Sequence, residues 1–176
     1  TIADWVQAGR FAENDAGFDD EIPELGPLRN DDRIVRVDNI VLNRGFTQDV
    51  SVRMYSKGVE HEIGLTLNYD ATKLQFVNAI RGRDVPPDWE FVLENETEAE
   101  NGQVGIQVGL LPANPVPPPN LDTFPGGDVE IARLTFRAAD GIGTVGTPLT
   151  FGDSVFSRAV RDFTGTRIYA AFADAA

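Results

Sequence analysis

The sequence predicts an all-β domain in which two sheets pack face to face. Apolar side chains alternate with small or polar ones over Ile63–Tyr69 and again over Val104–Leu110. This period of two places the apolar set on one face of a half-buried strand. Asn101-Gly102, just before the second run, is a signal for a two-residue hairpin turn. Strands of this length, separated by turn residues, are typical of a β-sandwich.

Composition limits the classes of partner. The 176 residues suffice for one domain with one core. Fifteen Lys and Arg against 28 Asp and Glu give a net charge of −13, which opposes approach to nucleic acid and to anionic lipid. No run approaches the roughly 18 apolar residues of a membrane span. The sequence has no cysteine and so no disulfide framework. The acidity suits a secreted or cell-surface protein, and the opening TIADWV indicates a piece of a longer chain.

The N-terminal part is expected to be a helix followed by a linker. Over residues 1–12, Ile2, Trp5 and Val6 share one helical face. Residues 13–33 combine eight acidic side chains with glycine and proline, a composition typical of an extended, solvated linker. No fixed ligand spacing for calcium is visible in this acidic stretch.

From Ile34 the pattern is that of strands up to residue 174. Apolar residues over Ile34–Leu42 predict a first strand or a bent pair, and Val50–Met54 predicts the next. After Ile63–Tyr69, the run that restarts at Leu74 and Phe76 continues through either Val77 or Ala79. The later strands are predicted over Trp89–Glu94, Val104–Leu110, Val129–Ala138, Phe151–Asp162 and Arg167–Phe172.

Residues 111–127 carry six of the 11 prolines and are predicted to be a stiff loop, since proline fixes φ and removes donors. One interpretation is a pre-ordered loop that exposes Leu121 and Phe124 for binding. The other is a loop that folds back to cover one end of the sandwich.

Three stretches resemble cohesin domains, the secreted modules that receive dockerins in cellulosome-type assemblies. They are IGLTLNYDATKLQFVNAIRG at 63–82, VEIARLTFRA at 129–138, and the run of strands from Phe151 to Phe172. The resemblance covers roughly residues 34–172 and implies a nine-stranded jelly-roll β-sandwich. It also implies a non-catalytic recognition module of an extracellular bacterial protein that takes part in polysaccharide catabolism.

In cohesins one sheet face receives the dockerin, through strands that here match Val59–Asn68, Trp89–Glu94 and Val104–Leu110. Counting with a period of two along these strands gives the outward positions. The predicted partner-binding residues are Glu62, Gly64, Thr66, Glu90, Val92, Gln107 and Gly109.

The N-terminal stretch resembles the exit of a dockerin calcium loop. On that alignment Asp4 matches the last carboxylate ligand. The other ligands would precede Thr1, so we predict no bound calcium or other cofactor unless a longer chain restores them. A plain amphipathic helix explains the same residues. A further hypothesis is that the helix is itself the partner, docking on the sandwich of its own or a neighbouring chain.

The sequence leaves two other non-enzymatic functions and an enzyme as alternatives. A carbohydrate-binding module would need aligned exposed aromatic side chains for its polysaccharide, and Trp89 is the only obvious strand candidate. A structural spacer of a large surface protein would show no partner. Gly141–Gly146 matches G-x-G-x-x-G but precedes Thr147-Pro148 and no helix. The single histidine, His61, is expected near the end of the core face, and we expect no enzyme.

Overall fold

The computed structural model describes residues 33–94, 99–109, 123–139 and 144–175. The chain divides into two units, 1–32 and 33–176, and every described residue lies in the second. The predicted helix over 1–12, with Asp4, and nearly all of the predicted linker over 13–33 therefore lie outside the described residues. Residues 110–122, most of the proline-rich loop, also lie outside them.

The described residues contain no helix, and therefore none that is long and apolar enough to cross a membrane. They form the following strands: β1 (Ile34–Val37), β2 (Ile40–Leu42), β3 (Thr47–Ser56), β4 (Glu60–Asn68), β5 (Leu74–Arg81), β6 (Glu90–Glu94), β7 (Gln103–Gly109), β8 (Gly127–Ala138), β9 (Val145–Thr147), β10 (Thr150–Gly152), β11 (Ala159–Asp162), β12 (Arg167–Ile168) and β13 (Ala171–Ala173).

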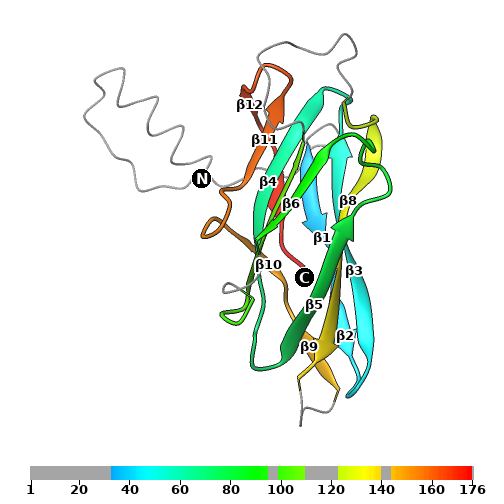
Figure 1. Ribbon diagram of the computed structural model, residues 1–176, viewed down its shortest axis with the longest axis vertical. Helices are drawn as coiled ribbons and strands as arrows, with labels where there is room; N and C mark the ends of the chain where they lie inside the picture. Colours follow the sequence, from blue (N-terminus) through cyan, green and yellow to red (C-terminus); the bar gives the residue numbers. More distant parts are fainter. Residues whose placement is uncertain (1–32, 95–98, 110–122, 140–143, 176) are drawn as a thin grey trace, which may run out of the picture. The chain divides into compact units, whose positions relative to one another are not determined.

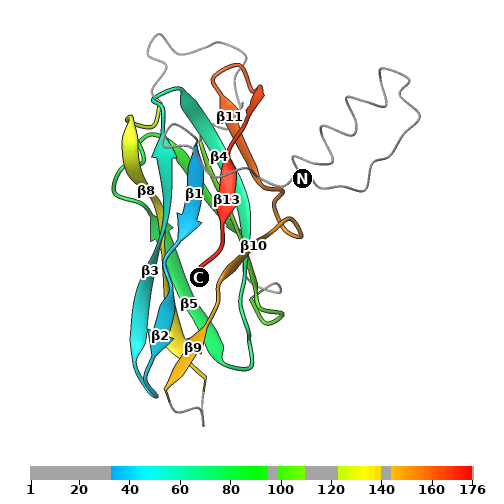
Figure 2. The same ribbon diagram turned by 180° about the vertical axis from the view of Figure 1, so that it is seen from behind.

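Two large sheets make up the sandwich (Figure 1). One has the strand order β13-β1-β3-β8-β5, and the other has β12-β11-β4-β7-β6 with β10 also paired to β4. A small sheet, β2-β9, lies at one end, and Figure 2 shows the molecule from behind, with β1 beside β13. The predicted all-β sandwich is confirmed. The described strands outnumber the nine expected because five of them, β2, β9, β10, β12 and β13, are short pieces of two or three residues.

The core lies between the two large sheets and follows the predicted alternation. Ile63, Leu65 and Leu67 of β4 are fully buried, and so are the inward residues of β7 paired with them. From the other sheet, Leu134 and Phe136 of β8 close the core. The period-two pattern thus fixes which face of β4 and β7 points outward.

A β-bulge resolves the two alternatives for β5. The pairing with β8 shifts register between Phe76 and Asn78, so Val77 is the extra residue and is half exposed. Ala79 then returns to the inner face and is buried. A bulge inserts one residue on one strand only, which is why the alternation of the sequence breaks at this position.

A buried carboxylate fixes the turn between β3 and β4. Glu60 is fully buried and accepts hydrogen bonds from Ser56 Oγ at 2.6 Å and from the backbone N–H groups of Lys57 and Val59 at 3.0 Å. Arg33 donates to the same carboxylate. Burial by itself raises the pKa of Glu60, but the hydrogen bonds outweigh it and lower the pKa to about 2. The Glu60 carbonyl also accepts the N–H of Phe124 at 2.9 Å.

Candidate functional site: the outward face of the six-stranded sheet

The outward face of β4, β7 and β6 brings together all the residues predicted as a binding surface. Strand pairing arranges this face in three rows that run across the strands. In the order β4, β7, β6 the rows are Glu62–Gly109–Glu90, Gly64–Gln107–Val92 and Thr66–Gly105–Glu94. We call them the first, second and third row.

The middle of the face is flat. Gly109 and Gly105 flank Gln107 on β7, and Gly64 lies beside Gln107 on β4. Glycine has no side chain beyond its backbone, so only Gln107 projects from the centre of the face. A flat sheet surface of this kind permits another segment to approach the backbone closely.

Acidic side chains border this flat centre, and one of them belongs to a polar network. Arg161 of β11 pairs with Glu62 in register, and its Nη1 lies 2.6 Å from Glu62 Oε1. Gln107 Nε2 donates to the same oxygen at 3.0 Å. The network leaves Glu62 only 9% exposed, whereas Glu90 and Glu94 at the β6 edge are exposed.

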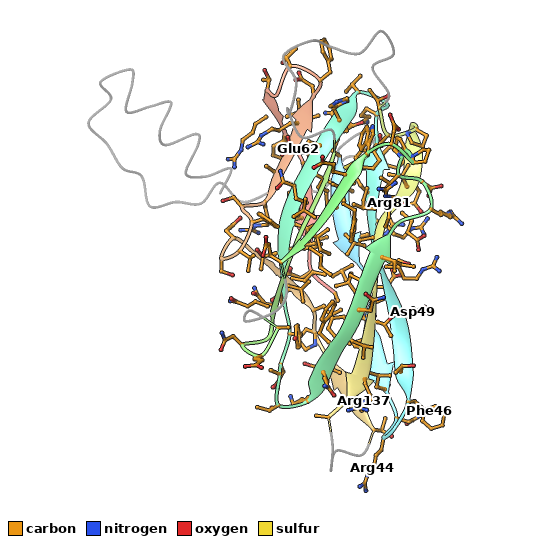
Figure 3. All side chains as sticks on the ribbon, in the orientation of Figure 1. Arg44, Phe46, Asp49, Glu62, Arg81 and Arg137 are labelled. Atoms are coloured by element: carbon orange, nitrogen blue, oxygen red, sulfur yellow. The ribbon has the colours of Figure 1, made fainter. Side chains whose placement is uncertain are left out.

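Figure 3 shows Glu62 on β4, at the opposite end of the sandwich from Arg44 and Phe46. The exposed aromatic ring of Phe46 is thus remote from the candidate face.

The third row is covered by residues 153–158, which connect β10 to β11 and which we call the strap. Thr66 Oγ1 accepts hydrogen bonds from the N–H groups of Val155 at 3.1 Å and Phe156 at 2.9 Å. The same hydroxyl donates to the Phe156 carbonyl at 2.9 Å. Thr66 is consequently fully buried although its strand phase points it outward.

Glycine lets the strap lie directly on the sheet. A Cβ at Gly105 would come within 2.4 Å of Val155 Cγ1 and 2.9 Å of Phe156 Cδ2, closer than real contacts allow. A Cβ at Gly64 would lie 3.3 Å from the Ser157 carbonyl oxygen. The strap therefore depends on the absence of a side chain at Gly105.

An ion pair joins the two ends of the strap. Asp153 accepts the Arg158 N–H at 2.7 Å, and its carboxylate lies 2.8 Å from Arg158 Nη2. Hydrogen bonding from Arg158 lowers the pKa of Asp153. The Arg158 guanidinium also lies 5.9 Å from the centre of the Phe172 ring.

All seven predicted residues lie on this face, but Glu62, Gly64, Thr66 and Gly109 are buried, and binding of a partner by the seven stays a prediction. Thr66 lies on the predicted face but under the strap, so it is unavailable to a partner in this arrangement. Glu94, Arg161 and the strap residues Val155 and Phe156 border the same face and were missed. The period of two gives Glu94 directly, because it continues the alternation of Glu90 and Val92.

Two aromatic side chains considered for surface recognition are instead in the core. Trp89 is 1% exposed and packs between Phe124 and His61, with ring centres 4.7 and 5.1 Å away. This burial removes Trp89 as a sugar-stacking platform. Phe124 is also fully buried, so at this position the chain folds back on the sandwich, whereas Leu121 lies outside the described residues. His61 is buried, as its position next to Ile63 predicted.

No group of three or more His, Cys, Asp or Glu side chains is placed to hold a metal ion within the described residues. Gly146 of the G-x-G-x-x-G match lies in strand β9, whose last residue is Thr147. Thr147, Pro148 and then strand β10 follow the match, and not the helix that a phosphate-binding loop of this type requires.

Comparison with known proteins identifies the fold through structure alone. No protein-family model matches the sequence, and no curated protein is similar to it. CaCohA2 of Clostridium acetobutylicum, in its complex with CaDoc0917, superposes with a TM-score of 0.66 at 20% identity, over 81% of this chain and 96% of that one.

Two further cohesins, from other organisms, are also similar to this chain in structure. The sixth cohesin of Acetivibrio cellulolyticus scaffoldin B, in complex with a Cel5 dockerin mutant, gives 0.65 at 20% identity over 82% and 96% of the two chains. A non-cellulosomal cohesin from the archaeon Archaeoglobus fulgidus gives 0.61 at 15% identity over 82% and 88%. The chain therefore has the cohesin fold, as the resemblance of its sequence implied.

Proposed function

We propose that this chain is a non-catalytic protein-recognition module that binds a dockerin-type helical partner on the outward face of its six-stranded sheet. The observation that carries the proposal is the cohesin fold itself. Several of the similar structures are cohesins in complex with dockerins. An extracellular or cell-surface assembly, of the kind that degrades polysaccharide, is the setting proposed for such a module.

The chemistry of the face supports this assignment. Gln107 presents a partly exposed polar group among the glycines of the centre, and Val92 beside it is a partly exposed apolar group. Glu90 and Glu94 are exposed at the β6 edge, so a partner surface with Lys or Arg side chains complements the face. Such charge complementarity mainly sets the rate and the specificity of association.

Binding to dockerin modules tests the proposal. The whole chain is immobilised, and a panel of purified dockerins, including CaDoc0917 and the Cel5 dockerin, is measured by biolayer interferometry in calcium and in EDTA. We expect at least one dockerin to bind in calcium. Replacing Gln107 by Arg fills the flat centre of the face and should weaken that binding at least about tenfold, because central interface positions dominate affinity.

A matched pair of valine variants locates the binding surface. Val92 is half buried in the second row, and Val41 on β2 is 62% exposed in the small sheet. Val92→Arg should weaken dockerin binding, and Val41→Arg should leave it unchanged. Binding that tolerates both Gln107→Arg and Val92→Arg would place the partner elsewhere. Absence of binding across the panel would contradict the proposed function.

A further inference from the structure

We infer that the strap is a wall of the docking surface, which confines the partner to the part of the face formed by Gln107, Val92 and Glu90 and contacts it through Val155 and Phe156. This inference rests on the proposed function and specifies its footprint. Thr66 is then a positioning residue that holds the strap, and it makes no contact with the partner. Strand phase alone cannot give this role, because the strap lies about 90 residues away from Thr66 in the sequence.

The strap is a built part of the fold, since residues of β4, β7 and β13 contact it and an ion pair joins its own ends. The Thr66 hydroxyl uses its donor and both acceptor positions on strap backbone groups. Gly105 gives the room that Val155 and Phe156 occupy. The Asp153–Arg158 ion pair joins the two ends of the strap, and the Phe172 ring lies against the Arg158 guanidinium.

The position of the strap restricts where a partner can lie. It covers Thr66 and Gly105, two of the three residues of the third row, and leaves Glu94 exposed. Its Ser157 carbonyl also lies close to Gly64 of the second row. In the first and second rows, Gln107 and Val92 are partly exposed and Glu90 is exposed, whereas Glu62, Gly64 and Gly109 are buried. A partner helix therefore meets the face at Gln107, Val92 and Glu90, with one side against the strap.

The side chains that face this space define the chemistry of the partner. Val155, Phe156 and Val92 are partly exposed apolar groups around the glycine-rich centre. Glu90 and Glu94 are acidic at the β6 edge. These groups suit an amphipathic helix that has apolar side chains toward the strap and Lys or Arg side chains toward β6.

Hydrogen exchange tests the attachment of the strap without any partner. Thr66→Val keeps the shape of the side chain and removes the hydroxyl. The amides of Val155 and Phe156 should then exchange at least about tenfold faster, because their acceptor is lost. Gly105→Ala should have the same effect by displacing the strap. Thr47→Val on β3, at an exposed position, is the control and should leave both amides unchanged. Unchanged exchange in both strap variants would refute the attachment.

Binding of a dockerin from the panel tests the wall. Val155→Asp puts a charge on the apolar edge and should weaken binding about tenfold or more. Val77→Asp makes the same change at the half-exposed bulge of β5, in the other sheet, and should have no effect. If Gln107→Arg abolishes binding while Val155→Asp does not, the wall is refuted and the proposed function stands. If no dockerin binds, the proposed function fails, and the docking role of the strap fails with it.

Discussion

Replacing Glu60 by Gln should destabilise the protein by about 3 kcal/mol at neutral pH, and the loss should disappear in acid. The Glu60 carboxylate is fully buried and accepts hydrogen bonds from Ser56, Lys57, Val59 and Arg33. Gln keeps the size of the side chain, but it removes the charge and turns an NH₂ group toward donors.

The magnitude follows from proton linkage. The pKa of Glu60 falls from 4.5 to about 2 in the folded protein. A shift of roughly 2.5 pKa units corresponds to about 3 kcal/mol at 1.36 kcal/mol per unit. Because the folded pKa is depressed, this stabilisation is fully present above pH 4.5. It is lost as the pH falls through about 2.

Urea denaturation, followed by tryptophan fluorescence, measures the effect at a series of pH values from 7 down to 2. The gap in free energy of unfolding between wild type and Glu60→Gln should be about 3 kcal/mol at pH 7 and should approach zero near pH 2. The matched control is Glu100→Gln, at an exposed position, which should change stability by less than about 0.5 kcal/mol. A Glu60→Gln gap that does not vary with pH would refute this account of the buried carboxylate.

Three further predictions concern the core and its turns. Burial raises the pKa of Tyr69 to about 12, so the absorbance change of its ionisation should lie near pH 12. Stability present below pH 10 should be lost between pH 10 and 12, and ionisation near pH 10 would contradict this. Gly102→Ala should cost at least about 1 kcal/mol in a urea titration, because φ is +80° and a Cβ would lie 2.2 Å from the Tyr69 carbonyl oxygen. Leu65→Ala should cost about 2–5 kcal/mol, against less than about 0.5 kcal/mol for Val77→Ala at the half-exposed bulge; equal losses would show that Leu65 is not in a packed core.

Strand positions and faces were predictable because they depend on local alternation. Every predicted strand from Ile34 to Leu110 has its counterpart, with ends that differ by a few residues. The inner face of β4 was read correctly from Ile63, Leu65 and Leu67. The Val77 bulge was not predictable, because a bulge is defined by the register against β8, more than fifty residues further along the chain.

The burial of charged and polar groups was harder to predict from the sequence than the positions of the strands. A glutamate at the start of a strand is ordinarily solvated, and Glu60 becomes buried only because Arg33 and a tight turn supply several donors to it. Nothing in its immediate sequence distinguishes Glu60 from Glu62, two residues later. Glu62 instead lies on the outward face with Arg161.

Thr66 shows why a predicted sheet face is not yet a predicted binding site. The period of two decides which way a side chain leaves its strand, and it placed Thr66, Gly64 and Gln107 on one side correctly. What lies above that side depends on chain segments remote in sequence, here the strap over Thr66. Thr66 and Gln107 were equivalent candidates by phase. Because only Gln107 retains exposed surface, only a substitution there can test partner binding without also displacing the strap.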